Sequence, residues 1–332
     1  MTVSDASTAP VAVGLIGAGL IGAFHGETLA RRVPGARLAG VADPAPGAAE
    51  RLAASLGAPL ATTDPAELLA DPAVEAVVIA APARFHADLV EAAAGAGKAV
   101  FCEKPLALTK AAAIEAVTAC RKAGVVLGIG TDKRYFPALA ETIRLTDSGE
   151  LGPLLHVEGN FSNEVAATFA EWRESLTETP AGGMTGTGIH VLDVLTRIAG
   201  PVRRVHAQFL SKKPGPDSWD SLAVLLEFAS GVGGTLAAVR STPTFLRVHA
   251  FGRNGSVEAV SRNEIMIRNS GAAPVRHKLE GADSVRTNLE AFADAVAGAA
   301  PYPIAPEHIL NVTNTFVAIA DAIRTGVAMQ EV

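Results

Sequence analysis

The chain has 332 residues, of which 49% are apolar and 19% are charged, a composition that favours a globular protein of two domains. The net charge of −6, with no run of Lys or Arg, argues against a nucleic-acid-binding protein, which usually carries a basic face. No apolar stretch reaches roughly 20 residues without a charge, Gly or Pro, and residues 1–10 lack an export signal, so we expect a cytoplasmic protein without a membrane span.

Residues 1–130 alternate short apolar runs with longer, Ala-rich amphipathic stretches. The short runs predict strands over Val11–Ile16, Arg37–Ala42, Glu75–Ala80, Lys98–Cys102 and Val125–Ile129, because strands covered on both faces are almost continuously apolar. The stretches between them predict helices over Leu20–Arg32, Pro46–Leu56, Phe85–Ala96 and Thr109–Ala123. Alternation of this kind predicts a dinucleotide-binding Rossmann domain over residues 1–130, an α/β fold with a doubly wound parallel sheet.

The pattern changes over residues 131–332, where β-type runs follow one another with few helices between them. Strands are predicted over Leu154–Phe161, Val202–Leu210, Leu222–Phe228, Gly234–Arg240 and Leu246–Gly252. Helices are predicted over Pro137–Ser148, Met184–Ile198, Val285–Ala297 and Pro306–Thr325. These elements predict an α+β domain with a mostly antiparallel sheet; its last helix can pack back on the first domain.

The two cysteines, Cys102 and Cys120, have neither a metal-ligand spacing nor the pattern of a disulfide framework. Each lies in an apolar or helical stretch, as an ordinary buried thiol does. We therefore expect no metal site.

A G-x-G-x-x-G sequence follows the first predicted strand, as Gly17-Ala18-Gly19-Leu20-Ile21-Gly22, and opens the first predicted helix. In that context the first glycine makes a tight turn, the second lets the backbone approach a pyrophosphate, and the third packs the helix on the strand. The alternative is a simple glycine-rich turn. The motif predicts that Gly17, Gly19, Leu20, Ile21 and Gly22 bind a dinucleotide at the helix N-terminus.

Asp43 ends the second predicted strand, where a carboxylate can accept hydrogen bonds from the ribose hydroxyls of a dinucleotide and repel a 2′-phosphate. The next residues are Pro44-Ala45-Pro46-Gly47, with no Arg or Lys among them. This favours NAD over NADP as the cofactor, although Asp43 could also be a turn residue before Pro44.

Three segments at predicted strand ends together resemble the Gfo/Idh/MocA oxidoreductases: Gly17–Gly22, Ala80-Ala81-Pro82 with His86, and Cys102-Glu103-Lys104-Pro105. The Glu-Lys-Pro step after the fifth strand is the most specific of them. Further matches are Arg134-Tyr135, Gly149-Glu150-Leu151-Gly152, Trp172-Arg173 and Gly182-Gly183 leading to His190 and Asp193. The resemblance implies NAD(P)-dependent hydride transfer on a small hydroxylated or carbonyl substrate, such as a sugar or polyol. It also implies that residues 131–332 form a domain for substrate binding and oligomerisation on a large open sheet, through which a homodimer or homotetramer forms.

The same resemblance implies two catalytic residues. Lys104 is expected at the nicotinamide end, where its ammonium can hydrogen-bond the reacting oxygen. His190 matches the acid/base histidine of the family and can take or supply the hydroxyl proton. Glu103 is expected to contact the cofactor, as are Ala81, Pro82 and His86, the last near the nicotinamide ribose. Lys104 before a proline turn, His190 in a core helix and His86 at a helix start could each also have purely structural roles.

Arg134, Tyr135, Trp172 and Arg173 are candidate substrate contacts, and Arg173 could recognise a carboxylate or phosphate. Plain packing between the domains is the alternative for all four. Asp193 lies one helical turn after His190 and could orient it, or could pair within the core.

The sequence departs from the family at Gly186, where members that act on sugars and polyols typically carry an Asp four residues before the histidine. Either Thr187, Asn163 or Asp132 replaces the missing carboxylate, or the chemistry differs. Two other functions therefore stay open: an NAD-dependent enzyme that cleaves glycosidic bonds, and a nucleotide-binding regulator without catalysis.

Overall fold

A computed structural model describes residues 9–163, 178–210, 221–240, 242–327 and 330–332. The described chain forms two compact units. Unit 1 is built from Met1–Leu106, Ile114–Gly130 and Val285–Pro306, and unit 2 from Ala107–Ala113, Thr131–Ser284 and Glu307–Val332, within the limits of the described residues. Each unit has a sheet and a core of its own, and each is described separately below.

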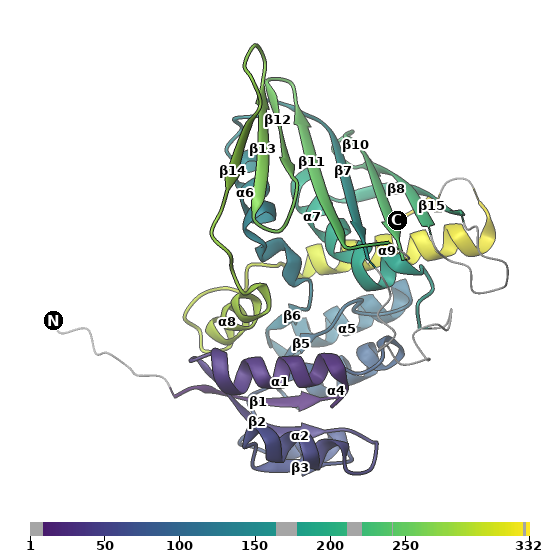
Figure 1. Ribbon diagram of the computed structural model, residues 1–332. Helices are drawn as coiled ribbons and strands as arrows, with labels where there is room; N and C mark the ends of the chain where they lie inside the picture. Colours follow the sequence, from purple (N-terminus) through teal and green to yellow (C-terminus); the bar gives the residue numbers. More distant parts are fainter. Residues whose placement is uncertain (1–8, 164–177, 211–220, 241, 328–329) are drawn as a thin grey trace. The chain divides into compact units, whose positions relative to one another are not determined.

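Unit 1 is built on a parallel sheet that has six strands among the described residues (Figure 1). These are β1 (Val11–Ile16), β2 (Ala36–Ala42), β3 (Leu60–Thr62), β4 (Ala76–Ile79), β5 (Ala99–Cys102) and β6 (Leu127–Ile129). Their order is β3-β2-β1-β4-β5-β6, and every pairing is parallel. From β1 the chain adds β2 and β3 on one side, and it then adds β4, β5 and β6 on the other side. The boundary between β1 and β4 is therefore the topological switch point of a Rossmann fold.

Helices cover this sheet because its strands are apolar on both faces, as the fully buried β1 illustrates. They are α1 (Leu20–Arg32), α2 (Ala48–Leu56), α3 (Pro65–Ala70), α4 (His86–Gly95), α5 (Lys110–Ala123) and α8 (Ser284–Val296), with a 3₁₀ turn, η1, over Ala83–Phe85. Asp64 caps α3 by accepting a hydrogen bond from the Ala66 amide. Phe292 of α8 packs edge-on against Phe101 of β5, so α8 completes the core of unit 1.

Unit 2 is built on a sheet of nine strands within the described ranges. These are β7 (Leu154–Ser162), β8 (Val202–Leu210), β9 (Ser221–Phe228), β10 (Gly233–Val239), β11 (Phe245–Gly252), β12 (Gly255–Ala259), β13 (Glu264–Asn269), β14 (Val275–Lys278) and β15 (Gln330–Glu331). The order is β14-β13-β12-β11-β7-β10-β9-β8-β15, and only the pairing of β7 with β10 is parallel among the pairings described.

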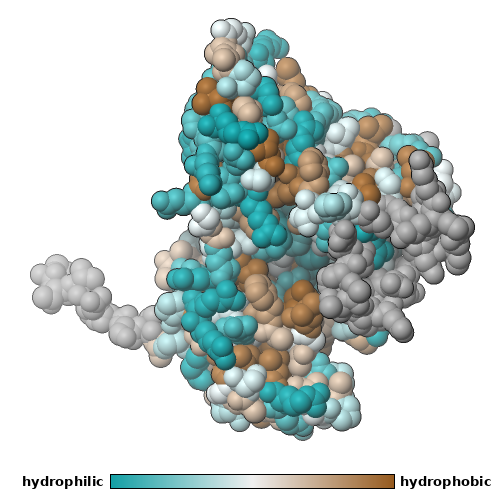
Figure 2. Space-filling view, in the orientation of Figure 1, coloured by the Kyte–Doolittle hydropathy of each residue, from teal (hydrophilic) through white to brown (hydrophobic). Residues whose placement is uncertain are grey.

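One face of this second sheet packs on helices, whereas no helix of the described residues covers the other face. The helical elements are η2 (Asp132–Tyr135), α6 (Pro137–Asp147), a π-helical turn η4 (Met184–Gly188), α7 (Ile189–Ala199) and α9 (Pro306–Thr325). Val157 and Leu236 point to the helices and are buried with Leu192 and Phe316, whereas Leu225 on the opposite face is exposed. Figure 2 shows hydrophobic and hydrophilic residues mixed over the visible strands of this unit.

The structure confirms the predicted fold class, a parallel Rossmann sheet followed by a mostly antiparallel sheet. Two segments fall in a different unit from the one expected from a division after residue 130, because residues 107–113 belong to unit 2 and residues 285–306 to unit 1. The last helix, α9, belongs to unit 2. Within the part of the chain that the structure describes, no helix is long and apolar enough to cross a bilayer.

Candidate active site

The residues predicted to bind a dinucleotide gather at one edge of the sheet of unit 1. Gly17 directly follows β1, Asp43 follows β2, Ala80 and Ala81 follow β4, and Glu103 follows β5. Because all these strands are parallel, their carboxyl ends lie along the same edge, on both sides of the switch point between β1 and β4. A dinucleotide binds at this place in doubly wound sheets, so the topology of unit 1 supplies its binding edge.

The glycine loop has the geometry that a pyrophosphate requires. Gly17 has φ of +103°, a left-handed value that favours glycine, and a Cβ there would lie 2.7 Å from the Ala80 carbonyl oxygen. A Cβ on Gly22 would lie 1.8 Å from the carbonyl oxygen of Gly17, so any side chain would separate α1 from the loop. A Cβ on Gly19, by contrast, would meet nothing within 4 Å, which leaves the backbone open to a ligand beside the start of α1.

Asp43 is tied directly to this loop. Its Oδ2 accepts a hydrogen bond of 2.7 Å from the Ala18 amide, and its Oδ1 accepts one of 2.9 Å from the Ala45 amide. Each carboxylate oxygen has a further lone pair, so the side chain can hold the loop and still accept from a ribose hydroxyl. The half-buried carboxylate thereby joins the ends of β1 and β2 into one binding surface.

His86, at the start of α4, is buried and joins two loops of unit 1. Its Nε2 lies 2.8 Å from the Ala81 carbonyl oxygen and its Nδ1 lies 2.7 Å from that of Pro105. Burial lowers the pKa of His86, outweighing the two carbonyl contacts, which act to raise it. These contacts hold the segment after β4, which contains Ala81 and Pro82, against the segment that follows Lys104.

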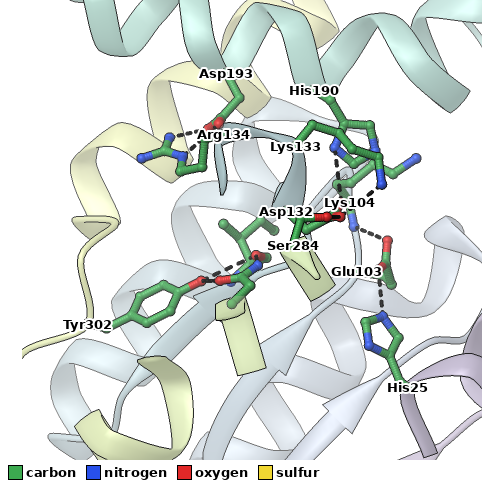
Figure 3. Close-up of polar contacts among 12 residues, drawn as sticks. His25, Glu103, Lys104, Asp132, Lys133, Arg134, His190, Asp193, Ser284 and Tyr302 are labelled. Carbon is green, nitrogen blue, oxygen red and sulfur yellow. Dashed lines mark hydrogen bonds and ion pairs between the residues drawn. The ribbon is translucent and has the colours of Figure 1, made fainter. Parts of the chain in front are cut away.

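Glu103 and Lys104 follow β5, and the carboxylate of Glu103 is held from two sides (Figure 3). Its Oε1 lies 2.7 Å from Nε2 of His25 in α1, and its Oε2 accepts a hydrogen bond of 3.1 Å from the Lys104 amide. Burial acts to raise the pKa of Glu103, but the His25 hydrogen bond and the charges of His25 and Lys104 outweigh it and lower this pKa to about 2. An ionised Glu103 therefore fixes the backbone from which the Lys104 side chain extends.

In unit 2, His190 opens α7 beside Asp132 of η2. Nδ1 of His190 lies 3.7 Å from Oδ1 of Asp132, and both side chains are largely buried. Oδ2 of Asp132 accepts hydrogen bonds from the Ser284 hydroxyl at 2.6 Å and from Nζ of Lys133 at 2.8 Å (Figure 3). The structure thus brings Asp132 and His190 together, two residues that the sequence separates by 58 positions.

A second ion pair joins η2 to α7. Nε of Arg134 donates to Oδ2 of Asp193 at 2.8 Å, and Nε2 of His308 in α9 lies 2.9 Å from Oδ1 of the same carboxylate. Burial acts to raise the pKa of Asp193, but Arg134 and His308 outweigh it and lower this pKa. The guanidinium of Arg134 thus pairs with Asp193 inside unit 2. Asp193 likewise pairs within the core.

The other predicted substrate contacts are placed as follows. The Thr187 hydroxyl donates to the carbonyl oxygens of Phe161 and Gly183. Asn163 follows β7, and its amide donates to the Val239 carbonyl oxygen. Tyr135 closes η2, and burial raises its pKa to about 12. Trp172 and Arg173 lie outside the described residues.

Two family profiles match this chain over most of its length. The oxidoreductase family with an NAD-binding Rossmann fold matches residues 11–131, and the Gfo/Idh/MocA C-terminal domain matches residues 140–258. The scyllo-inositol 2-dehydrogenase (NAD(+)) of Bacillus subtilis (strain 168) is 32% identical over 253 residues, which cover 73% of this chain and 72% of that protein. The chain belongs to the Gfo/Idh/MocA family of oxidoreductases. It is an NAD(P)-dependent dehydrogenase whose Rossmann unit binds NAD.

Other comparisons agree with membership of the Gfo/Idh/MocA family. Inositol 2-dehydrogenase 1 of Saccharopolyspora erythraea is 30% identical over 298 residues, which cover 86% of each chain. A levoglucosan dehydrogenase solved in complex with NADH and levoglucosan superposes with a TM-score of 0.86 over 98% of this chain and all of that one. The identity to this solved structure is 23%, so the superposition shows a shared fold.

Gly186, where many Gfo/Idh/MocA members have a carboxylate, lies in the π-helical turn before α7. A Cβ on Gly186 would meet nothing within 4 Å among the described atoms, so glycine is not required there for lack of space. Sequence reasoning did not identify His25, Ser284 or His308. Each contacts a residue more than 75 positions away in the chain, and no local sequence motif indicates that contact.

Proposed function

We propose that this Gfo/Idh/MocA dehydrogenase oxidises a cyclic polyol of the inositol class with NAD. The support comes from relatives at 30–34% identity whose names specify inositol 2-dehydrogenases. The observation that carries the proposal is that one chain contains both an NAD-binding edge, in unit 1, and a buried histidine–carboxylate pair, in unit 2. A polyol hydroxyl must lose both a hydride and a proton, and such a pair is suited to accept the proton.

In this proposal the residues of unit 1 hold and orient the dinucleotide. The open backbone at Gly19 and the N-terminus of α1 bind the pyrophosphate, and the Asp43 carboxylate accepts from the adenosine ribose. Bound NAD supplies the acceptor for the hydride that leaves the substrate carbon. Glu103 is buried between His25 and the Lys104 amide, so its contribution is to position Lys104.

His190 and Lys104 then have complementary roles on the substrate oxygen. Neutral His190 accepts the hydroxyl proton as the carbon loses its hydride, and it returns that proton in the reductive direction. The Lys104 ammonium donates a hydrogen bond to the same oxygen, which stabilises the negative charge that develops there. We expect His190→Ala and Lys104→Ala each to lower kcat by about 100- to 10,000-fold while NADH still binds.

The test is a fluorescence titration with NADH and NADPH, followed by a panel of inositols, sugars and hydroxy acids in which formation of reduced nicotinamide is measured. The proposal predicts tighter binding of NADH than of NADPH, and turnover of at least one inositol with NAD. Turnover of hydroxy acids alone would overturn the substrate class. Binding of NADH without turnover, together with cleavage of a glycoside, would favour the glycoside-cleaving alternative.

We further propose that the chain forms a homodimer or homotetramer through the outer face of its second sheet. Opposed residues of neighbouring strands lie on one face, which places Leu225, Thr235, Glu158 and His249 in one row across it. Leu225 is 57% exposed in this row, in a face without helices to cover it in the described chain. The expected cytoplasmic location stays a prediction.

A further inference from the structure

Position 186 is a glycine and supplies no carboxylate, and the structure discriminates among Thr187, Asn163 and Asp132, the three residues considered in its place. The Thr187 hydroxyl donates its hydrogen to the backbone, to the carbonyl oxygens of Phe161 and Gly183. Asn163 carries no charge. Asp132 alone among the three has a carboxylate, and this carboxylate lies 3.7 Å from Nδ1 of His190.

We propose that Asp132 is a positioning residue that orients His190 and stabilises its protonated form, in place of the carboxylate absent at position 186. The inference rests on the proposed function, in which His190 accepts the substrate proton. It assigns this role to a residue of η2, a different element of unit 2 from the helix that carries His190.

The carboxylate of Asp132 is held in a defined orientation. Ser284 and Lys133 both donate to Oδ2, at 2.6 and 2.8 Å, so that Oδ1 is the oxygen turned to the imidazole. Asp132 is 6% exposed and His190 is 6% exposed, so water screens their interaction little. The separation of 3.7 Å exceeds a hydrogen bond, and the interaction is therefore an electrostatic one that strengthens when the imidazole gains a proton.

The backbone around Asp132 is fixed by the second ion pair between the same two elements. Arg134 lies two residues after Asp132, and Asp193 lies three residues after His190, so the Arg134–Asp193 pair joins the same two elements. In this pair η2 supplies the cation and α7 the carboxylate, whereas in the Asp132–His190 contact η2 supplies the carboxylate. His308 of α9 supports Asp193 from the other side. The two contacts together hold η2 against α7 and set the distance from Asp132 to the ring of His190.

This arrangement supplies His190 with a carboxylate although position 186 is a glycine and Asp193 pairs with Arg134. A carboxylate beside Nδ1 favours the tautomer with the proton on Nδ1, which leaves Nε2 to accept the substrate proton. Once Nε2 is protonated, the imidazolium faces the carboxylate of Asp132. The Ser284 hydroxyl and the Lys133 ammonium contact Asp132, and the ring of Phe161 lies beside His190, with a centroid distance of 6.5 Å.

The test is NMR titration of the His190 ring in protein labelled at histidine, with the resonance assigned from the His190→Gln variant. We expect Asp132→Asn to lower the titration midpoint of His190 by about one pH unit, because it removes the anion beside Nδ1. The matched control is Asp147→Asn, which removes an exposed ion pair to Arg197 at the far end of α7 and should leave the midpoint unchanged. An unchanged midpoint in folded Asp132→Asn would overturn the proposal.

If Asp132→Asn fails to fold, Ser284→Ala carries a second test, because it keeps the charge of Asp132 but removes one of the two donors that orient its carboxylate. We expect a downward shift smaller than about one unit, and no shift would contradict the proposal. The pH dependence of kcat/KM gives the second readout, whose acidic limb should move to lower pH by the same amount as the NMR midpoint. If the wild-type protein oxidises no polyol, the proposed function fails, whereas the NMR titration still decides whether Asp132 acts on His190.

Discussion

The carboxylate of Asp43 contacts the Ala18 amide and lies at the end of β2, so one side chain serves both the loop and the proposed ribose site. We expect Asp43→Ala to weaken NADH binding by about 10- to 100-fold, because the ribose loses charge-assisted hydrogen bonds to the carboxylate. NADPH binding should weaken much less, because its 2′-phosphate is repelled by that carboxylate. Fluorescence titration measures both affinities. Asp88→Ala, an exposed carboxylate of α4, is the control and should change neither; equal losses for the two dinucleotides would contradict the role of Asp43.

Glu103 provides a prediction for stability. Its pKa is lowered to about 2 from 4.5, so the stabilisation it provides is present above pH 4.5 and is lost as the pH falls toward 2. We expect Glu103→Gln to lower the free energy of unfolding by about 3 kcal/mol at neutral pH, and the difference from wild type to narrow below pH 4.5. Urea unfolding at a series of pH values measures this.

The control for Glu103 is Glu27→Gln, which removes an exposed ion pair with Arg31 on α1, the helix that also carries His25. Its effect should stay below about 1 kcal/mol at every pH. A Glu103→Gln difference that is constant from neutral pH to about pH 3 would show that the charge of Glu103 contributes nothing to stability.

Residues whose role depends on neighbours in the sequence were predictable, and residues whose role depends on the fold were not. The glycine loop and Asp43 were recognised because they directly follow apolar strands. His25 was not, since its partner Glu103 lies 78 positions away. Arg134 was placed among the substrate contacts because a sequence does not reveal which way a guanidinium turns, and the structure turns it to Asp193.

At the scale of elements, two buried contacts among the described residues join η2 to α7, and the hydrogen-bonded Arg134–Asp193 pair contributes more to stability than the Asp132–His190 contact at 3.7 Å. We expect Asp193→Asn to destabilise the protein by about 3 to 5 kcal/mol, because Arg134 then loses the carboxylate that compensates its burial. Asp147→Asn makes the same change on an exposed pair to α7 and should cost less than about 1 kcal/mol. Equal effects of the two substitutions in urea unfolding would contradict this difference.

Elements with strong apolar patterns were predicted with their bounds. The strands Val11–Ile16 and Val202–Leu210 and the helices Leu20–Arg32 and Pro306–Thr325 match the structure residue for residue. The short strands β3, β12, β13, β14 and β15 were missed, as was helix α3. β14 is exposed at every position, so its pairing with β13 produces no alternation of apolar and polar residues in the sequence. Such a strand cannot be predicted from hydrophobic periodicity.

At the scale of the whole molecule, the outer face of the second sheet is the proposed interface between copies. We expect Leu225→Glu to convert the oligomer to smaller species in light scattering. Leu225 is 57% exposed on this face, and the substitution places a charge in the proposed apolar contact. Ile114→Glu introduces the same charge at an exposed residue of α5 and should leave the assembly intact. A wild-type protein that is monomeric would contradict the proposed interface.

The central claim is that this chain moves a hydride from a polyol carbon to NAD, and an isotope experiment tests it most directly. An inositol that carries deuterium on its ring carbons is incubated with the protein and NAD, and the reduced dinucleotide is analysed by mass spectrometry. The account predicts NADH that has gained deuterium, and loss of this product in His190→Ala and Lys104→Ala. Reduced dinucleotide without deuterium, or none from any inositol despite NADH binding, would contradict it.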